Sequence, residues 1–121
     1  MLVGLQTLAV LMFSLLDERG LPPTLMAAYR AERSATLHGL WPRKGALRVG
    51  SDADLCVLER GDFVFDEPGI VDRPELRWSP YHLRHMRALV AATLQRGRLI
   101  WDRTQVLAQP GDGRFVRREA H

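Results

Sequence analysis

The stretch WPRKGALRVGSDADLCVLE, residues 41–59, marks the point at which the character of the sequence changes. Residues 1–40 ahead of it are dominated by apolar and helix-forming residues, whereas short apolar runs separated by Gly, Pro and Asp follow it. The first pattern is typical of helices and the second of strands joined by turns. The stretch itself carries turn signals at Gly45 and Gly50, ahead of the β-rich run LCVLE. We therefore predict an α+β fold in which helices come first and a small sheet follows.

The first predicted helix contains the run LAVLMFSLL, residues 8–16. Gly20 closes this segment as a C-terminal glycine does. Because the run is apolar all round, we expect the helix to be buried on more than one face. It is about half the length needed to cross a bilayer, and neither a preceding Lys or Arg nor a cleavage site indicates a signal peptide.

A second helix is predicted to start at Pro22 and Pro23, which suit a first helical turn. Ser34 is expected to cap a last short turn, which Gly39 ends. Helix therefore fills most of the sequence ahead of Trp41.

Two hairpins are predicted from Leu55 onward. LCVLE (55–59) and FVF (63–65) flank Arg60-Gly61-Asp62, which has the composition of a turn. In LVAATLQRGRLIWD (89–102), apolar residues alternate around the turn candidate Arg96-Gly97.

The composition limits the class of protein to which the chain can belong. The chain has 121 residues, 46% of them hydrophobic and 26% charged, with a net charge of +3, which fits one domain or part of one. Basic residues are interleaved with acids, so we expect no nucleic-acid partner, and the short apolar run predicts no membrane partner. Cys56 is the only cysteine, which excludes an internal disulfide and a cysteine-based zinc site and fits a reducing, cytoplasmic compartment.

The candidate chemical groups are few. His82 and His85 are three apart and would share a helical face as metal ligands, but no third ligand lies at a suitable spacing, so we favour exposed histidines. Asp52 and Asp54 form either a carboxylate pair or a turn, and the preceding Gly-Ser favours the turn. Cys56 lies within an apolar strand, where a thiol is usually inert packing. Residue chemistry alone thus indicates no active site and no metal site.

A resemblance emerges when the motifs are taken in order. GLWPRKGALRVGSDADLCVLE (39–59), RWSPY (77–81), RGRLIWD (96–102) and PGDGRFVRR (110–118) resemble the C-terminal portion of the cyclic amidohydrolases. This is the dihydroorotase, hydantoinase (dihydropyrimidinase) and allantoinase group of the amidohydrolase superfamily. With GLQT (4–7) the resemblance covers nearly the whole chain. Its motif residues are interpreted as structural: Pro42, Arg43, Lys44, Gly45, Gly50, Ser51, Asp52, Asp54, Ser79, Pro80, Tyr81, Gly111, Gly113 and Arg114.

The resemblance implies a fold that this chain contains only in part. Residues 1–40 would be the helical remnant of the C-terminal end of a (β/α)8 barrel, and residues 41–121 the C-terminal part of a small β-sandwich. The sequence departs from the family at several places, including Asp112, where a His is often found.

The resemblance also implies a centre of divalent metal, zinc, held by His-x-His, a carboxylated Lys, two further His and an Asp. None of these positions is in this chain, which begins after them; Lys44 and the four histidines match none. We therefore expect no catalytic residue and no cofactor in the chain itself. The GLQT residues, Gly4, Leu5, Gln6 and Thr7, are the only ones that could lie near a substrate, because loops that follow barrel strands line the site. The alternative, which we favour, is that they merely start the helix.

Two functions follow as expectations. The chain would be a segment of a metal-dependent hydrolase of ring amide C–N bonds, either a truncated frame or half of a split enzyme. It would be inactive without a complementing barrel-containing chain. Alternatively, it would be a non-catalytic structural or interaction subunit derived from that fold. Open strand edges and an uncovered apolar helix also predict a homo-oligomer.

Overall fold

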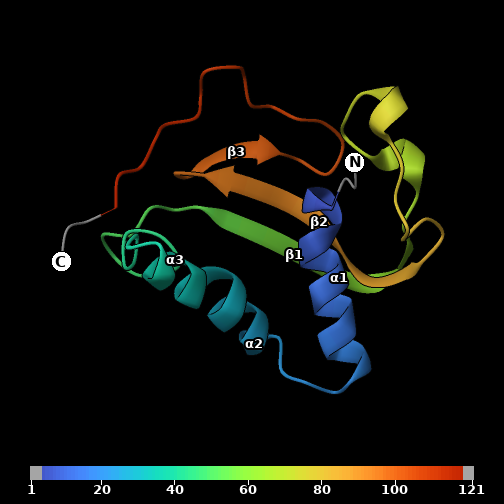
Figure 1. Cartoon of the computed structure of the whole chain (residues 1–121), viewed down its shortest axis with the longest axis horizontal. Coiled ribbons are helices and arrows are strands. Elements are labelled where there is room, and N and C mark those ends of the chain that lie inside the picture. The colour runs from blue at the N-terminus through green and yellow to red at the C-terminus, as the bar shows by residue number, and fades with distance from the viewer. Residues whose placement is uncertain (1–3, 119–121) are drawn as a thin grey trace. The chain divides into compact units, whose positions relative to one another are not determined.

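The computed structural model describes residues 4–118 and confirms the predicted α+β fold (Figure 1). Helices come first: α1 (Leu5–Glu18), then α2 (Thr24–Ala27), the π-helical turn η1 (Ala28–Glu32) and α3 (Arg33–Leu37) in one run. Strands β1 (Leu55–Val64), β2 (His85–Gln95) and β3 (Arg98–Trp101) form a sheet in the order β1-β2-β3. Between β1 and β2 lie the 3-10 turns η2 (Glu67–Gly69) and η3 (Pro74–Leu76).

The chain packs as two compact units. Unit 1 is formed by Met1–Pro22 with Leu58–Leu89, and unit 2 by Pro23–Val57 with Val90–His121. This division concerns packing within the chain. The division at residue 40 into a barrel remnant and part of a sandwich concerns the parent fold and stays a prediction.

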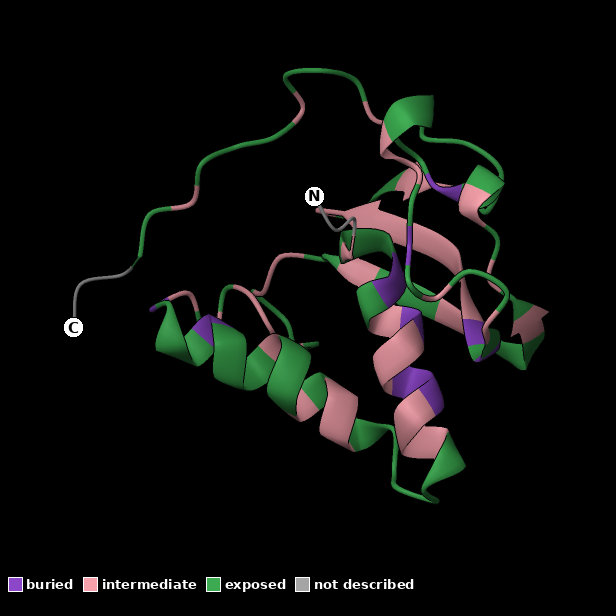
Figure 2. Cartoon of the chain, turned by 45° about the vertical axis from the view of Figure 1, so that its right-hand side comes forward, coloured by how far each residue is buried: buried purple, intermediate pink, exposed green. Residues whose placement is uncertain are grey.

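In unit 1, α1 has one buried stripe, formed by Thr7, Val10, Phe13 and Ser14 (Figure 2). The expectation of burial on more than one face is wrong, because the apolar side chains off this stripe remain at least partly exposed and Leu5 is 89% exposed. The predicted end at Gly20 is confirmed: this residue has φ 64°, and the Leu21 amide donates to the Leu16 carbonyl at 2.9 Å.

Ser14, the single polar residue in the apolar run, joins α1 to β2. Its hydroxyl accepts a hydrogen bond from the Arg87 amide at 2.8 Å and donates to the Val10 carbonyl at 2.6 Å. The side chain is fully buried beside Met86. Without this acceptor the Arg87 amide would lose its hydrogen bond, so Ser14 fixes where the helix lies on the strand.

The predicted hairpin at Arg60-Gly61-Asp62 is wrong, because β1 continues through all three residues. Both charged side chains find partners outside the supposed turn. Arg60 pairs with Asp17 of α1 at 3.0 Å, and Asp62 contacts the His85 ring at 2.9 Å. In its extended conformation this segment therefore makes contacts with residues that are distant in the sequence.

In unit 2, the predicted helix start after Pro22 and Pro23 is confirmed, as is its end at Gly39, which has φ 66°. The prediction that Ser34 caps a separate turn is wrong. The helix runs through this position without a break, and its side chain makes no capping bond. Much of the helix surface is exposed (Figure 2).

The second predicted hairpin is confirmed. Arg96 and Gly97 both have positive φ, 49° and 80°, as a two-residue turn with right-handed strand twist requires. Gln95 pairs with Arg98 in the antiparallel register. The helical arrangement considered for His82 and His85 is wrong, because His85 begins β2 while His82 lies in the preceding turn.

A further turn follows β3. The Asp102 carboxylate accepts hydrogen bonds from the amides of Thr104 and Gln105, both at 2.9 Å, and from the Thr104 hydroxyl at 2.7 Å. These bonds, the Thr104 hydroxyl first, lower the pKa of Asp102 to about 2. The turn returns the chain so that the Leu107 amide donates to the Ile100 carbonyl at 2.8 Å.

Among residues 4–118 there is no helix that combines the length and apolar character needed to cross a membrane.

Replacing Ser14 with Ala should destabilise the chain by about 1–3 kcal/mol, because the Arg87 amide loses its acceptor, the fully buried Ser14 hydroxyl. The matched control Ser34→Ala changes an exposed serine and should alter the free energy of unfolding by less than about 0.5 kcal/mol. Urea unfolding followed by circular dichroism measures both. Equal effects of the two substitutions would contradict the role of Ser14.

The Asp102 turn should make stability depend on acid. A carboxyl whose folded pKa is depressed stabilises the fold above its unfolded pKa of 3.8, and this contribution is lost as pH falls toward about 2. Asp102→Asn should therefore flatten the decline of the thermal midpoint between about pH 5 and about pH 2. Asp66→Asn, a carboxylate outside the turn, serves as control. An unchanged profile in Asp102→Asn would contradict the assignment.

Candidate functional site: the Lys44 corner

Most of the stretch WPRKGALRVGSDADLCVLE folds into a closed loop, residues 40–54, which we name the corner. Hydrogen bonds join its two arms: the Asp52 amide donates to the Arg43 carbonyl at 2.9 Å, and the Ser51 hydroxyl donates to the Pro42 carbonyl at 2.6 Å. Gly50 has φ 92°, a value that side chains rarely allow. The corner is therefore closed at its base by backbone and hydroxyl bonds.

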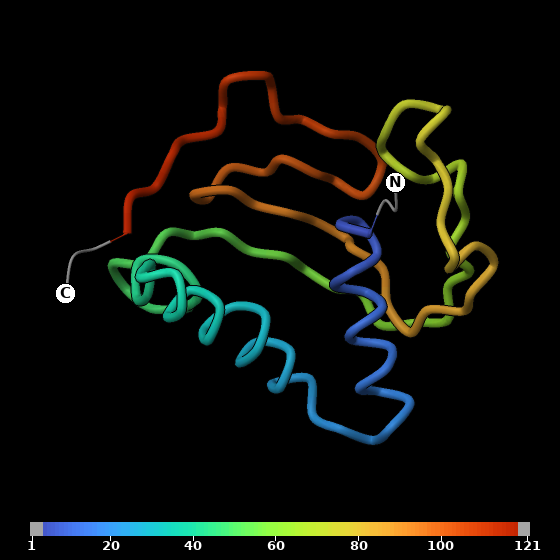
Figure 3. The backbone as a smooth tube through the Cα atoms, viewed as in Figure 1, coloured from blue at the N-terminus to red at the C-terminus, as the bar shows by residue number. Residues whose placement is uncertain are grey.

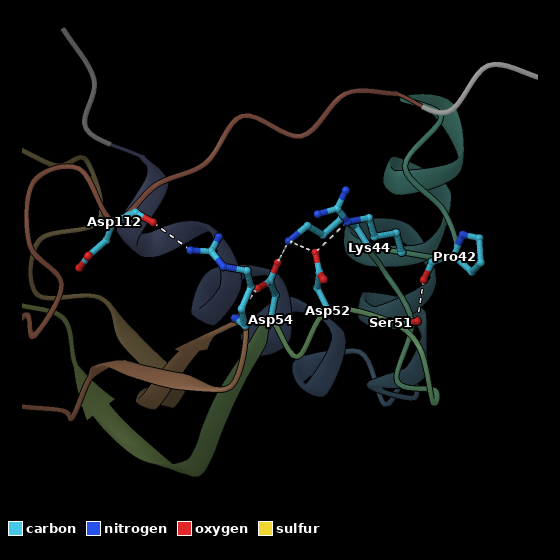
Figure 4. A network of polar contacts seen from close by, with 8 residues as sticks. Pro42, Lys44, Ser51, Asp52, Asp54 and Asp112 are labelled. Atoms are coloured by element: carbon cyan, nitrogen blue, oxygen red, sulfur yellow. Dashed lines mark hydrogen bonds and ion pairs between the residues drawn. The ribbon is translucent and has the colours of Figure 1, made fainter.

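Lys44 lies between the two aspartates (Figure 4). Its ammonium pairs with Asp52 at 2.9 Å and also with Asp54, and Arg43 adds a second contact to Asp52 at 3.2 Å. The Lys44 side chain is 18% exposed, so this group is much less open to water than a typical surface ion pair. One ammonium thus ties the arm of residues 40–44 to the segment that leads into β1.

The charges in this cluster support one another. Partial burial disfavours the charged form of Lys44, but the hydrogen bonds and charges of Asp54 and Asp52 outweigh it and raise its pKa. The hydrogen bond from Lys44, with help from Arg43, lowers the pKa of Asp52. The charged forms of Lys44 and Asp52 therefore stabilise each other, and the carboxylates of Asp52 and Asp54 both contact a cation.

Gly45 sets the corner against the helix of unit 2. It has φ 78°, and a Cβ at this position would lie 2.5 Å from the Ala31 carbonyl oxygen and 2.7 Å from the Ala35 Cβ. Such distances are overlaps, and the nearest atom belongs to backbone that cannot swing aside. Only glycine fits this position in both conformation and space.

The corner is also bonded to the β2–β3 hairpin. Asp54 accepts a hydrogen bond from the Arg96 amide at 2.8 Å, and the Ala53 carbonyl accepts one from the Gly97 amide at 2.9 Å. The Arg96 guanidinium donates in turn to the Asp112 carbonyl at 2.9 Å. Asp54 therefore contacts both the Lys44 ammonium and the hairpin turn.

Asp112 continues this network into the C-terminal segment. Its carboxylate accepts the Gln109 amide at 2.7 Å and pairs with Arg98. The Gln109 bond, followed by the Arg98 contact, lowers the pKa of Asp112. Gly111 has φ 94°, whereas Gly113 has an ordinary φ and Arg114 is exposed.

The SPY motif forms a separate turn in unit 1. Ser79 is buried, its amide donates to the Glu67 carboxylate at 2.9 Å, and its hydroxyl accepts the Tyr81 amide at 3.2 Å. Pro80 is exposed. The bonds to Ser79 are those of a loop-closing residue.

The GLQT residues begin α1. Gln6 bridges the loop after η2: its amide nitrogen donates to the Gly69 carbonyl at 2.9 Å, and its oxygen accepts the Val71 amide at 2.8 Å. Thr7 is buried and its hydroxyl donates to the Gly4 carbonyl at 3.1 Å. Leu5 and Gln6 are exposed, whereas Gly4 is half-buried. Their proximity to a substrate stays a prediction.

The remaining candidates do not converge. His82 accepts the Glu67 amide at 3.3 Å, while His85 faces Asp62. Within residues 4–118, no group of three or more His, Cys, Asp or Glu side chains is placed to hold a metal ion. The expectation that Cys56 is packed inside the strand is wrong: the residue is exposed, although partial burial of the thiol, opposed by Arg30, raises its pKa.

The corner can brace but offers no reactive group. Each carboxylate is engaged by cations or backbone amides, so none is placed as a free base or ligand. Local sequence signals identified the glycines and aspartates of the corner and the Arg96-Gly97 turn, but not the bonds of Arg96 to Asp54 and Asp112. In unit 1 they missed Ser14, although a lone serine in an apolar run is a signal that could have indicated it.

Solved structures contain the same α+β arrangement as a segment of a longer chain. A D-hydantoinase structure matches 91% of the chain with a TM-score of 0.83 and 25% identity, over 24% of its own length. The L-hydantoinase structure from Arthrobacter aurescens matches 83% of the chain, with a TM-score of 0.70 and 27% identity, over 22% of its length.

Sequence relatives give the same answer. The allantoinase of Rubrobacter xylanophilus is 35% identical over 119 residues, which is 94% of this chain and 25% of the relative. The L-hydantoinase of Paenarthrobacter aurescens is 35% identical over 91 residues, 72% of this chain and 19% of the relative. No family model matches. The chain is a homologue of the cyclic amidohydrolases, consistent with their C-terminal portion, and it spans about a quarter of the length of these relatives.

Substitution at the two corner glycines separates strain from overlap. Gly50→Ala should cost about 1–2 kcal/mol, because the backbone is left-handed but the surrounding space is open. Gly45→Ala should cost about 1–3 kcal/mol more, because its Cβ meets the Ala31 carbonyl as well. Thermal and urea unfolding of both variants give the comparison. Equal costs would show that the contact between the corner and the helix is not tight.

Proposed function

We propose that this chain forms the C-terminal segment of a metal-dependent cyclic amidohydrolase, an enzyme that hydrolyses a ring amide C–N bond. The match to the allantoinase, 35% identity over 94% of the chain, is the observation that carries this proposal. The four structural motifs lie along that match in the order in which the resemblance requires them. The two hydantoinase structures support the same reaction class.

In this proposal α1 and the helix of unit 2 close the end of a (β/α)8 barrel, and the three strands contribute to the small β-sandwich. The Lys44 corner then lies where the chain leaves the helices and enters the sheet. Its ion cluster and its bond to the hairpin would hold that change of direction rigidly. The corner is thus structural, and the chemistry lies elsewhere in the enzyme.

The metal centre implied by the family needs ligands from other residues. The described residues do not fit it, since none of their His, Cys, Asp or Glu side chains gather as a ligand set. We therefore assign no metal-dependent step to residues 4–118. The barrel portion, in a second chain or in the same polypeptide, would supply metal and substrate contacts, and the assembled protein would work in the cytoplasm.

A segment exchange tests this proposal. The matching 119-residue segment of the Rubrobacter xylanophilus allantoinase is replaced by this chain. The chimera should fold, bind metal and hydrolyse allantoin, whereas the allantoinase lacking the segment should not. Metal content and ring opening are measured on the same preparation. A folded, metal-loaded chimera without ring-opening activity would contradict the proposal.

The same chimera offers an internal control. Gly45→Ala in the grafted segment should lower the yield of folded, metal-loaded enzyme, because the corner no longer packs on the helix. Gly50→Ala should lower it less, and specific activity per bound metal should be unchanged in both. A fall in activity per metal would indicate that the corner acts on the active site.

A non-catalytic interaction subunit is the second candidate function. Several large apolar side chains favour it, because they are left widely exposed: Leu5, Leu37, Leu47, Val49 and Phe115. A chimera without activity, together with stable association between this chain and a homologous intact enzyme, would favour this second function.

A further inference from the structure

Charge is distributed unequally between the two units. The described residues of unit 2, 23–57 and 90–118, hold eleven basic and five acidic side chains, a net charge of +6. Those of unit 1, 4–22 and 58–89, hold six basic and eight acidic side chains, a net charge of −2. The excess positive charge of the chain therefore lies in one unit.

Within unit 2, the basic groups of the corner and hairpin have partners. Lys44 and Arg43 are paired with Asp52, and Arg98 with Asp112. The situation changes in the segment Gly113–Arg118, GRFVRR, which we name the arginine strip. Its three arginines, 114, 117 and 118, are exposed and make no ion pair with any other described residue.

The arginine strip also carries an aromatic side chain in water. Phe115 is 89% exposed, next to Arg114 and two residues before Arg117. Exposed aromatic surface is unfavourable in water unless a partner covers it. Phenylalanine and arginine are also enriched at protein interfaces, where arginine pairs with carboxylates through two parallel hydrogen bonds.

The strip starts from a fixed point. Asp112, the residue before it, is held by Arg98, by the Gln109 amide and, through its carbonyl, by Arg96. Beyond this anchor the chain has no helix or strand up to residue 118 (Figure 3). The strip thus continues from a fixed residue, and its backbone forms no helix or strand.

We propose that the arginine strip is a docking site for an acidic protein segment, whose carboxylates pair with the three arginines while its apolar side chains cover Phe115. A protein partner is favoured over a nucleic acid because Phe115 offers one exposed apolar anchor, not a row of stacking platforms for bases. The inference stands on charge and exposure and does not depend on the hydrolase proposal.

Binding is measured on the full chain with a fluorescein-labelled peptide of Asp, Glu and Leu residues, by fluorescence anisotropy. The peptide with Asn and Gln in place of the acids is the ligand control. The chain should bind the acidic peptide and not the amide peptide. Affinity should fall as salt rises from about 50 to about 200 mM, since exposed charges are screened.

Variants locate the site. Replacing Arg114, Arg117 and Arg118 together with Gln should lower affinity about tenfold. The control triple Arg19→Gln, Arg73→Gln and Arg87→Gln changes net charge equally in unit 1 and should lower affinity less than about twofold. Phe115→Ala should lower affinity about tenfold although charge is unchanged.

Other outcomes would overturn the proposal. These are no binding of the acidic peptide, equal loss in both triple variants, or no effect of Phe115→Ala. Tighter binding of single-stranded poly(dT), or of vesicles that contain phosphatidylserine, would replace the protein partner with a general polyanion or a lipid surface. A dimer that the strip variants dissociate would replace it with a second copy of the chain.

Discussion

The contact between the Lys44 ammonium and the carboxylates of Asp52 and Asp54 is the interaction on which unit 2 depends. It is made where the chain passes from helix to sheet, and Asp54 extends it to the Arg96 amide in the hairpin turn. Removing one member of a partly buried charge cluster leaves the others without a partner, which costs more than the net value of the contact. The charges of Lys44, Asp52 and Asp54 therefore connect the helix, the corner and the hairpin.

In unit 1 a neutral group, the Ser14 hydroxyl, positions helix α1. Ser14 satisfies the Arg87 amide from within an apolar stripe, and Asp17, three residues further along α1, forms an ion pair with Arg60. These polar contacts position the C-terminal half of the helix, while Val10 and Phe13 supply burial. Burial alone is non-directional, so these contacts specify which of several similar positions α1 takes.

Local signals predicted features whose cause is local. Gly20, Gly39 and the Arg96-Gly97 turn were predictable because left-handed backbone favours particular residues whatever lies nearby. The supposed turn at Arg60-Gly61-Asp62 failed for the opposite reason. Its charged residues pair with Asp17 and His85, which are distant in sequence, so no local pattern reveals them.

The candidate site divides in the same way. The glycines and aspartates of the corner were identifiable from spacing, since turns need them. That Lys44 would join both carboxylates, and that Gly45 would touch the Ala31 carbonyl, depends on packing against the helix. The family could be inferred because several turn motifs kept their order, a property of the whole chain that does not depend on any single contact.

The bonds that join the corner to the hairpin have a consequence for how unit 2 opens. The Arg96 and Gly97 amides donate to residues of the corner, so neither can exchange with solvent unless corner and hairpin separate. The Asp52 amide donates to the Arg43 carbonyl and exchanges only when the corner itself opens. These segments should behave as one cooperative unit with a common opening free energy. The residues after Asp112 have no such restraint, and the boundary between slow and fast exchange should fall at that residue.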